Sequence, residues 1–167
     1  MAIAADRTPP QPQARSATGE RTGPTGARTG PAGRVLRALA AAHTVAISGQ
    51  PVFAGVYLSG DYDALTWHTA GADTVTTLGY LQLIAALVLW IRLRRAWPTA
   101  ATLAVAAAES VQYVAGLEGA LWLHLPLGVA TIAATVVLTV ALWRTPLPAR
   151  TARRAEGRTT RAEDDRA

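Results

Sequence analysis

Residues 74–95 read TVTTLGYLQLIAALVLWIRLRR, and this stretch decides the fold of the chain. It is apolar for most of its length, and a helix needs roughly 20 apolar residues to cross about 30 Å of hydrocarbon. It ends on three arginines, Arg92, Arg94 and Arg95, which is the charge typical of the cytoplasmic end of a membrane helix. The stretch therefore predicts a membrane-spanning helix that runs from the outside into the cell.

Three further apolar segments surround this one. The four expected helices lie at about residues 35–58, 73–93, 98–117 and 121–143. The connections RLRRAWP and GLEGA are short, so consecutive helices must pack antiparallel. The sequence therefore predicts an all-α fold, a membrane-embedded antiparallel four-helix bundle.

Polar sequence brackets the apolar part of the chain. Residues 1–33 hold five of the ten prolines, and residues 144–167 are charged and lack apolar periodicity. Neither segment has enough apolar side chains to form a core. We therefore predict one transmembrane domain at residues 34–143 between two disordered cytoplasmic tails. The mean hydropathy of +0.20 averages over this partition.

The basic residues give the orientation. The chain carries a net charge of +5, and all sixteen of its basic residues are arginines. They lie before residue 38, at 92–95 and from residue 144 onward. This clustering at alternate helix ends is typical of cytoplasmic loops and is not a basic face for nucleic acid. We expect a multi-pass protein of the cell membrane, in contact with the lipid bilayer, with both termini in the cytoplasm.

Several chemistries are excluded by what the sequence lacks. The chain has no cysteine, so disulfides, thiolate metal sites and covalent haem attachment are excluded. The glycine-rich motifs of nucleotide sites do not occur, nor do the motifs of serine hydrolases and zinc proteases.

Two ionisable residues fall inside the expected spans at similar depth. His43 lies roughly 12 Å and Glu109 roughly 16 Å from the cytoplasmic starts of their helices, at 1.5 Å per residue. Charged groups in a bilayer are costly, so these two should face the interior of the bundle and find each other. The sequence predicts a buried polar pair, which either handles a proton or ligand or is a structural hydrogen-bonded contact.

The other two histidines, His68 and His124, lie at the external starts of the second and fourth helices. These helices run in the same direction and are diagonal in a four-helix bundle, where a cofactor fits between facing side chains. Neutral imidazole is a good axial ligand for haem iron, and the lack of cysteine favours noncovalent haem b. Two alternatives stay open. Both histidines are structural residues at the membrane interface, or they bind zinc or copper with Asp61 or Asp63.

A family resemblance accompanies these histidines. The segments WHTAGADTVTTLGYLQLIAALVLW and LWLHLPLGVATIAATVVL resemble the second and fourth helices of one half of haem A synthase. The resemblance implies that His68 and His124 ligate haem, as the helix-opening histidines of that family do. The chain has half the family's length and lacks its carboxylate and cysteine features in the first outer loop, so synthase activity is not implied. With SGDYDALTWHTAGA, the chain is also similar to small actinobacterial four-helix membrane proteins, which implies topology alone.

The sequence thus leads to one functional prediction and one alternative. We predict an integral membrane protein that binds b-type haem between its second and fourth helices near the outer face, for electron transfer. Its partners would be the lipid bilayer and either a membrane redox protein or further copies of the chain. The alternative is a non-catalytic accessory or scaffold protein in which every histidine is structural.

Overall fold

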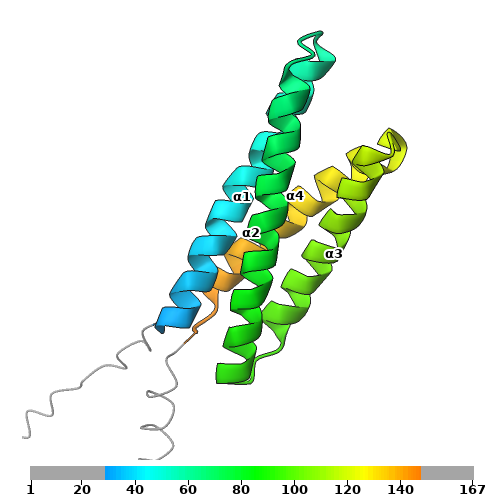
Figure 1. Ribbon diagram of the computed structural model, residues 1–167. Coiled ribbons are helices and arrows are strands. Elements are labelled where there is room, and N and C mark those ends of the chain that lie inside the picture. The colour runs from blue at the N-terminus through cyan, green and yellow to red at the C-terminus, as the bar shows by residue number, and fades with distance from the viewer. Residues whose placement is uncertain (1–28, 148–167) are drawn as a thin grey trace, which may run out of the picture.

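The computed structural model describes residues 29–147 and builds them almost entirely from four helices. These helices are α1 (Pro31–Leu58), α2 (Ala64–Leu93), α3 (Trp97–Leu117) and α4 (Leu121–Arg144) (Figure 1). The all-α four-helix prediction is confirmed. Most of the two tails predicted to be disordered, residues 1–28 and 148–167, lies outside the described residues.

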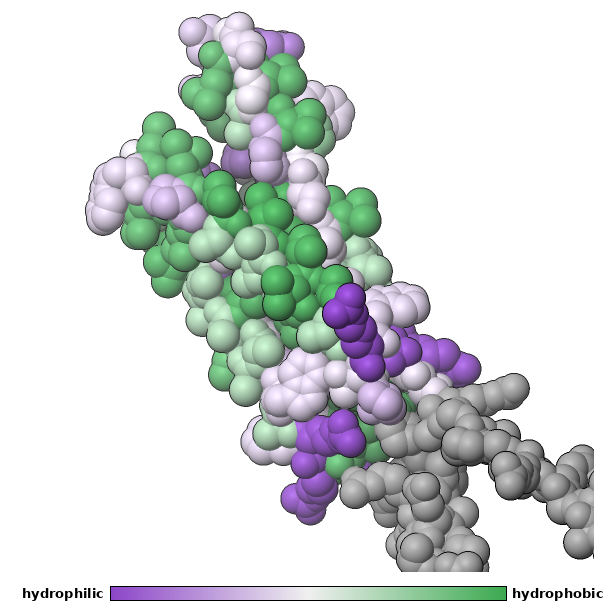
Figure 2. All heavy atoms as spheres, turned by 180° about the vertical axis from the view of Figure 1, so that it is seen from behind, coloured by the Kyte–Doolittle hydropathy of each residue, from purple (hydrophilic) through white to green (hydrophobic). Residues whose placement is uncertain are grey.

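All four helices are long and apolar enough to cross a membrane. The shortest, α3, has 21 residues and spans about 31 Å at 1.5 Å per residue, which matches the hydrocarbon thickness. Figure 2 shows the hydrophobic side chains, in green, covering the middle of the molecule, with purple hydrophilic side chains gathered at the end near the grey segments. The chain is therefore a multi-pass membrane protein.

Two helix starts differ from the predicted ones. α2 begins at Ala64 rather than near residue 73, because hydropathy marks the edge of the hydrocarbon and not the start of the helix. The real boundary is the turn before Ala64, where Gly60 has a φ of 104°, a conformation that favours glycine. α1 begins at Pro31, since proline fits the first turn of a helix.

Each predicted tail also includes residues that the structure places in the bundle. Residues 31–33 were expected to be disordered, yet they form the first turn of α1. Leu147, assigned to the other tail, is fully buried and its carbonyl accepts a hydrogen bond from the Gly30 N–H at 2.9 Å. The prediction was wrong here because residues 30–33 and Leu147, which are far apart in the chain, pack against each other and bury each other.

The helices form two hairpins, α1–α2 and α3–α4, and neighbouring contacts also join α2 to α3 and α1 to α4. The diagonals are therefore α1 with α3 and α2 with α4. Figure 1 shows the hairpins packed together where α1 begins and α2 ends, and diverging toward the opposite end. We call the first the arginine end, after Arg37, Arg92 and Arg144, and the second the histidine end, after His68 and His124.

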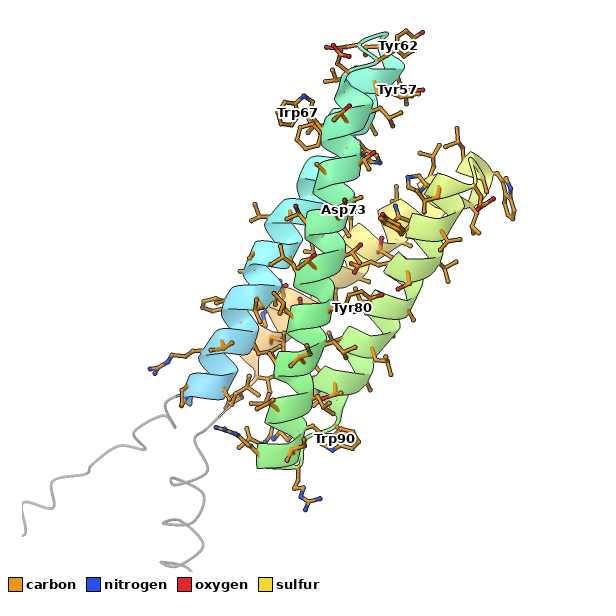
Figure 3. All side chains as sticks on the ribbon, in the orientation of Figure 1. Tyr57, Tyr62, Trp67, Asp73, Tyr80 and Trp90 are labelled. Atoms are coloured by element: carbon orange, nitrogen blue, oxygen red, sulfur yellow. The ribbon has the colours of Figure 1, made fainter. Side chains whose placement is uncertain are left out.

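The hydrophobic core lies toward the arginine end. Its buried residues come from all four helices and the segment after α4: Leu36, Ala40, Ala86, Leu89, Leu93, Val105, Leu138, Leu142 and Leu147. Many large apolar side chains outside this core are exposed, as lipid-facing residues are, although Ile47 and Val75 are buried. Aromatic side chains mark the two ends, with Trp67 near the histidine end and Trp90 near the arginine end (Figure 3).

Arg37 closes the bundle at the arginine end. Its guanidinium donates hydrogen bonds to the carbonyls of Leu142 at 2.9 Å and Thr145 at 2.8 Å, and lies 5.6 Å from the centroid of a Trp143 ring. The last carbonyls of a helix have no partner within the helix, and a cation there is favourable. Arg37 therefore ties α1 to the end of α4 and holds the diverging hairpins together at one end.

Candidate functional site: two polar layers across the bundle

The first polar layer lies in the interior of the bundle and joins three helices. His43 of α1 contacts Gln82 of α2 through Nδ1 and Oε1 at 3.0 Å. The same ring approaches Glu109 of α3, with Nε2 and Oε1 3.0 Å apart. The exposed fractions are 1% for His43, 0% for Gln82 and 5% for Glu109. We call these three residues the polar triad; it contains both members of the predicted buried pair.

Each member of the polar triad occupies a core position of its helix. On α1, His43 follows Leu36 and Ala40 along the buried face. On α2, Gln82 follows Gly79 at the spacing of three residues that keeps side chains on one helical face. The sequence analysis did not identify Gln82 as a partner, although this periodicity was a signal that would have placed it in the interior.

Gly79 makes room for the triad. A Cβ atom at this position would lie 2.9 Å from Glu109 Oε2 and 3.3 Å from His43 Cε1, so any side chain would crowd both residues. The absence of a side chain lets α2 approach α1 and α3 closely at this level. Sequence reasoning did not single out Gly79, because the need for a glycine arises only from the packing of three helices.

The protonation of the triad follows from its contacts. An amide oxygen only accepts hydrogen bonds, so His43 Nδ1 donates to Gln82 Oε1. A proton on the other side of the ring then lies between His43 Nε2 and Glu109 Oε1. This second contact has the distance of an ion pair, but its alignment is not that of a hydrogen bond, and Gln82 Nε2 has no partner within residues 29–147. His43 and Glu109 are thus coupled electrostatically, and polar atoms of the triad remain without a hydrogen bond.

The second polar layer is formed by His68 of α2 and His124 of α4, which we call the histidine pair. Their ring centroids are 6.1 Å apart, and the ring planes are inclined at 75°. The two side chains are half-buried and come from diagonal helices, as the positions of the two residues predict. The structure therefore brings together the two imidazoles that sequence reasoning singled out.

Neighbouring groups hold the histidine pair in place. His124 Nδ1 lies 2.9 Å from the carbonyl oxygen of Gln112 on α3, so this nitrogen carries the ring proton. Gly116 leaves space for the ring, since a Cβ there would lie 2.8 Å from His124 Nδ1. His68 Nδ1 is buried and without a hydrogen-bond partner in the described part of the chain. The pair thus combines one ring fixed by a backbone carbonyl with a second ring whose Nδ1 forms no hydrogen bond in residues 29–147.

The alternative zinc or copper site is not formed by the described residues. Among residues 29–147 no three histidine or carboxylate side chains are grouped closely enough to hold a metal ion. Asp61 and Asp63 lie in the connection between α1 and α2, and Asp61 Oδ1 accepts a hydrogen bond from the Asp63 N–H instead. The described residues therefore do not assemble the zinc or copper site that the sequence left open as an alternative.

Comparison with protein-family models, curated proteins and solved structures found no match to this chain.

Proposed function

We propose that this membrane protein binds a b-type haem between His68 and His124 and carries electrons through it. The approach of the two imidazoles across a diagonal of the bundle is the observation that carries the proposal. A haem held in this way would supply one-electron transfer, because its iron changes oxidation state while both axial ligands stay in place.

The separation of the rings fits two ligands on one iron. A metal–imidazole bond is about 2 Å long and a ring nitrogen lies about 1 Å from the ring centre, so two axial imidazoles have centroids about 6 Å apart. The centroids of His68 and His124 are 6.1 Å apart. This spacing is also compatible with a plain aromatic contact, for which the range is about 4.5–7 Å.

The hydrogen bond of His124 favours ligation over a plain aromatic contact. Metal-bound histidines commonly donate their other ring N–H to a backbone carbonyl, which fixes the tautomer and the ring orientation. His124 Nδ1 is engaged in this way by Gln112, and its Nε2 keeps a free lone pair. The unpartnered Nδ1 of His68 is the second nitrogen that a metal would satisfy.

The divergence of the two hairpins around the pair supports the proposal. The two hairpins diverge at the histidine end, and Figure 2 shows them ending in separate lobes that carry many hydrophobic side chains. The described arginines of the helices lie at the other end, so the propionates would face water and interfacial groups such as Trp122, which is 79% exposed. If the arginine end is cytoplasmic, as its charge favours, the haem lies near the outer face and exchanges electrons with a membrane or external redox protein.

The alternative proposal is an accessory or scaffold protein whose histidines are structural. The polar triad favours it, because a contact that joins three helices stabilises a bundle without any cofactor. The two proposals differ in whether the histidine pair has a ligand.

Visible spectroscopy separates the two. We expect the detergent-purified protein from haem-replete cells to show a sharp α-band in its reduced-minus-oxidised spectrum. His68→Ala and His124→Ala should each lose the band. Thr69→Ala is the matched control, since Thr69 is exposed and its hydroxyl bonds only to its own helix, at Leu65. A colourless wild-type preparation, or a band that survives both histidine substitutions, would reject the haem proposal.

A further inference from the structure

A narrow hollow lies between α2 and α3 at the level of the polar triad. Its empty space, open solvent included, is about 160 Å³ but leaves no room for a water molecule, and it is lined by Thr76, Gly79, Tyr80, Ala106, Glu109 and Ser110. Tyr80 is 49% exposed, so the mouth of the hollow faces the side of the bundle. In Figure 3 Tyr80 lies on α2 along the side next to α3. The exposed Tyr80 and the neighbouring Ser110 therefore line the same hollow as the buried carboxyl group.

The two carboxyl oxygens of Glu109 have different neighbours. Oε1 lies 3.0 Å from His43 Nε2, in the interior. Oε2 lies beside Gly79, where a Cβ atom would be 2.9 Å away and would crowd this side of the carboxyl group. Oε1 therefore contacts the imidazole, and Oε2 lies beside Gly79, where any residue with a side chain would fill the hollow.

Two hydroxyl groups lie at the mouth of the hollow. Tyr80 Oη and Ser110 Oγ are 3.2 Å apart, and Ser110 Oγ also donates to the carbonyl of Ala106 at 2.8 Å. Hydroxyl groups both donate and accept hydrogen bonds, so they are able to pass a proton along a chain. Within the triad, the fully buried Gln82 Nε2 lacks a partner in the described residues. A hydrogen-bond donor beside His43 and Glu109 is therefore unused.

No other charge balances the pair from nearby. Arg34 and Arg37 of α1 and Arg92 of α2 are at the arginine end, and α4 has ionisable groups only near its ends, His124 and Arg144. The remaining ones on these helices are Tyr57, His68, Asp73, Tyr80 and Tyr113, and Asp73 accepts a hydrogen bond from Tyr113 at 2.9 Å. Because an isolated charge is costly in a membrane, His43 and Glu109 must hold one proton between them in the resting state.

From this arrangement we propose that Glu109 and His43 form a proton-exchange site inside the membrane, reached through the hydroxyl groups of Tyr80 and Ser110 that line the hollow. A proton from water adds to Glu109 Oε2 while the proton between Nε2 and Oε1 stays on His43. The pair then carries one positive charge, and release of the added proton to the same hydroxyl groups restores neutrality. The ligand of this site is a proton, and the site is separate from the histidine pair.

A hydrophobic carbodiimide tests the proposal directly. Dicyclohexylcarbodiimide enters membranes and reacts with protonated carboxyl groups: the acid O–H adds across one C=N bond, and the adduct rearranges to a stable N-acylurea with no other reactant. The full-length protein in liposomes is treated over a series of pH values at which the bundle stays folded, and the modified residue is identified by mass spectrometry. We expect modification at Glu109 in the folded protein, because the reagent reacts with the protonated carboxyl group that the proposal requires.

Three variants sharpen the result. Glu109→Gln should abolish the modification, and Ser110→Leu, which fills the mouth of the hollow, should slow it about tenfold. Val111→Leu is the matched control, because Val111 is its neighbour on α3 but is 52% exposed on a lipid-facing side, and it should leave the rate unchanged. Circular dichroism checks that every variant keeps its helix content.

Three results would overturn the proton-exchange proposal. If Glu109 is modified in the denatured protein but not at any pH in the folded protein, the pair is a closed structural contact and the proposal is wrong. An equal slowing by Ser110→Leu and Val111→Leu would also overturn the proposed route. As a second measurement, a pH-difference infrared spectrum should contain a protonated-carboxyl band that is missing in Glu109→Gln. Absence of that band in the wild type would contradict the proposal even if a variant fails to fold.

Discussion

The polar triad and the histidine pair are both built across diagonals of the same bundle, but their surroundings differ. His43 and Glu109 are almost fully buried, and Gln82 joins them from a third helix. His68 and His124 are half-buried at the end where the hairpins diverge, and His68 Nδ1 forms no hydrogen bond in the described part of the chain. The comparison teaches that a polar residue in a membrane bundle is not functional by its chemistry alone. What distinguishes the two layers is burial: the triad lies in the interior, and the histidine pair lies half-buried at the open end of the bundle.

The largest expected effect is on stability, at the polar triad. Glu109→Leu leaves the His43 imidazole buried without its partner and should lower the free energy of unfolding by about 3–5 kcal/mol. The double variant His43→Leu with Glu109→Leu should recover most of this loss, because well-packed apolar residues replace a buried pair at little cost. Unfolding in mixed micelles with increasing denaturing detergent measures both. A double variant that is less stable than Glu109→Leu would contradict the view that the single loss comes from an unpaired group.

A smaller effect is expected from the glycine that accommodates the triad. In Gly79→Ala the new methyl group crowds Glu109 Oε2 and His43, and overpacking of this kind costs about 1–3 kcal/mol. Gly49→Ala is the matched control on α1, since nothing lies within 4 Å of its Cβ position, and alanine there should stabilise the helix by up to about 1 kcal/mol. Thermal unfolding of the two variants should therefore move in opposite directions; a shift of both in the same direction would show that Gly79 does not shape the triad.

At the histidine pair the corresponding glycine change should affect the ligand more than the fold. Gly116→Ala places a methyl group 2.8 Å from His124 Nδ1, but that ring is at the end of a side chain and near the open end of the bundle. We expect the ring to rotate away, with a loss of about 1 kcal/mol or less in stability. The α-band of the haem should weaken or shift in the reduced-minus-oxidised spectrum. An unchanged spectrum with a large loss of stability would show that this glycine supports the fold and not the ligand.

The smallest expected effect on stability comes from the histidines of the pair themselves. In the haem-free protein, His68→Ala and His124→Ala should each change the free energy of unfolding by less than about 1 kcal/mol, because half-buried side chains with few partners contribute little. The same unfolding measurement, made beside Glu109→Leu, gives the contrast between the layers. Losses near those of Glu109→Leu would mean that the histidine pair is a structural contact like the triad.

The fold was predictable because each membrane span is a long apolar run in the sequence. The apolar run that stops before Arg92 placed the C-terminal end of α2 correctly, and three of the four helices were placed within a few residues. The sequence left the start of α2 open between residue 73 and Leu65, because its first turns mix polar and apolar residues, and the structure places it at Ala64. The burial of Leu147 was missed because it depends on a contact with Gly30 and Gly33 far away in the chain.

The candidate sites were predictable only in part. Depth in the membrane was enough to pair His43 with Glu109, and helix direction was enough to pair His68 with His124. Gln82 could have been found from its spacing with Gly79, but the carbonyl of Gln112 could not. A backbone acceptor has no signature in the side-chain pattern, and its position depends on how closely α3 and α4 pack.

Titration of the haem-free protein with ferric haem tests the central claim, that the histidine pair is a ligand site, most directly. We expect saturation at one haem per chain with the visible spectrum of a six-coordinate, low-spin iron, and a five-coordinate, high-spin spectrum for His68→Ala and for His124→Ala. Gln112 and Gly116 are unchanged in both variants, so the difference reports the lost ligand. Identical spectra for the wild type and both variants, or no saturable binding by the wild type, would contradict the claim.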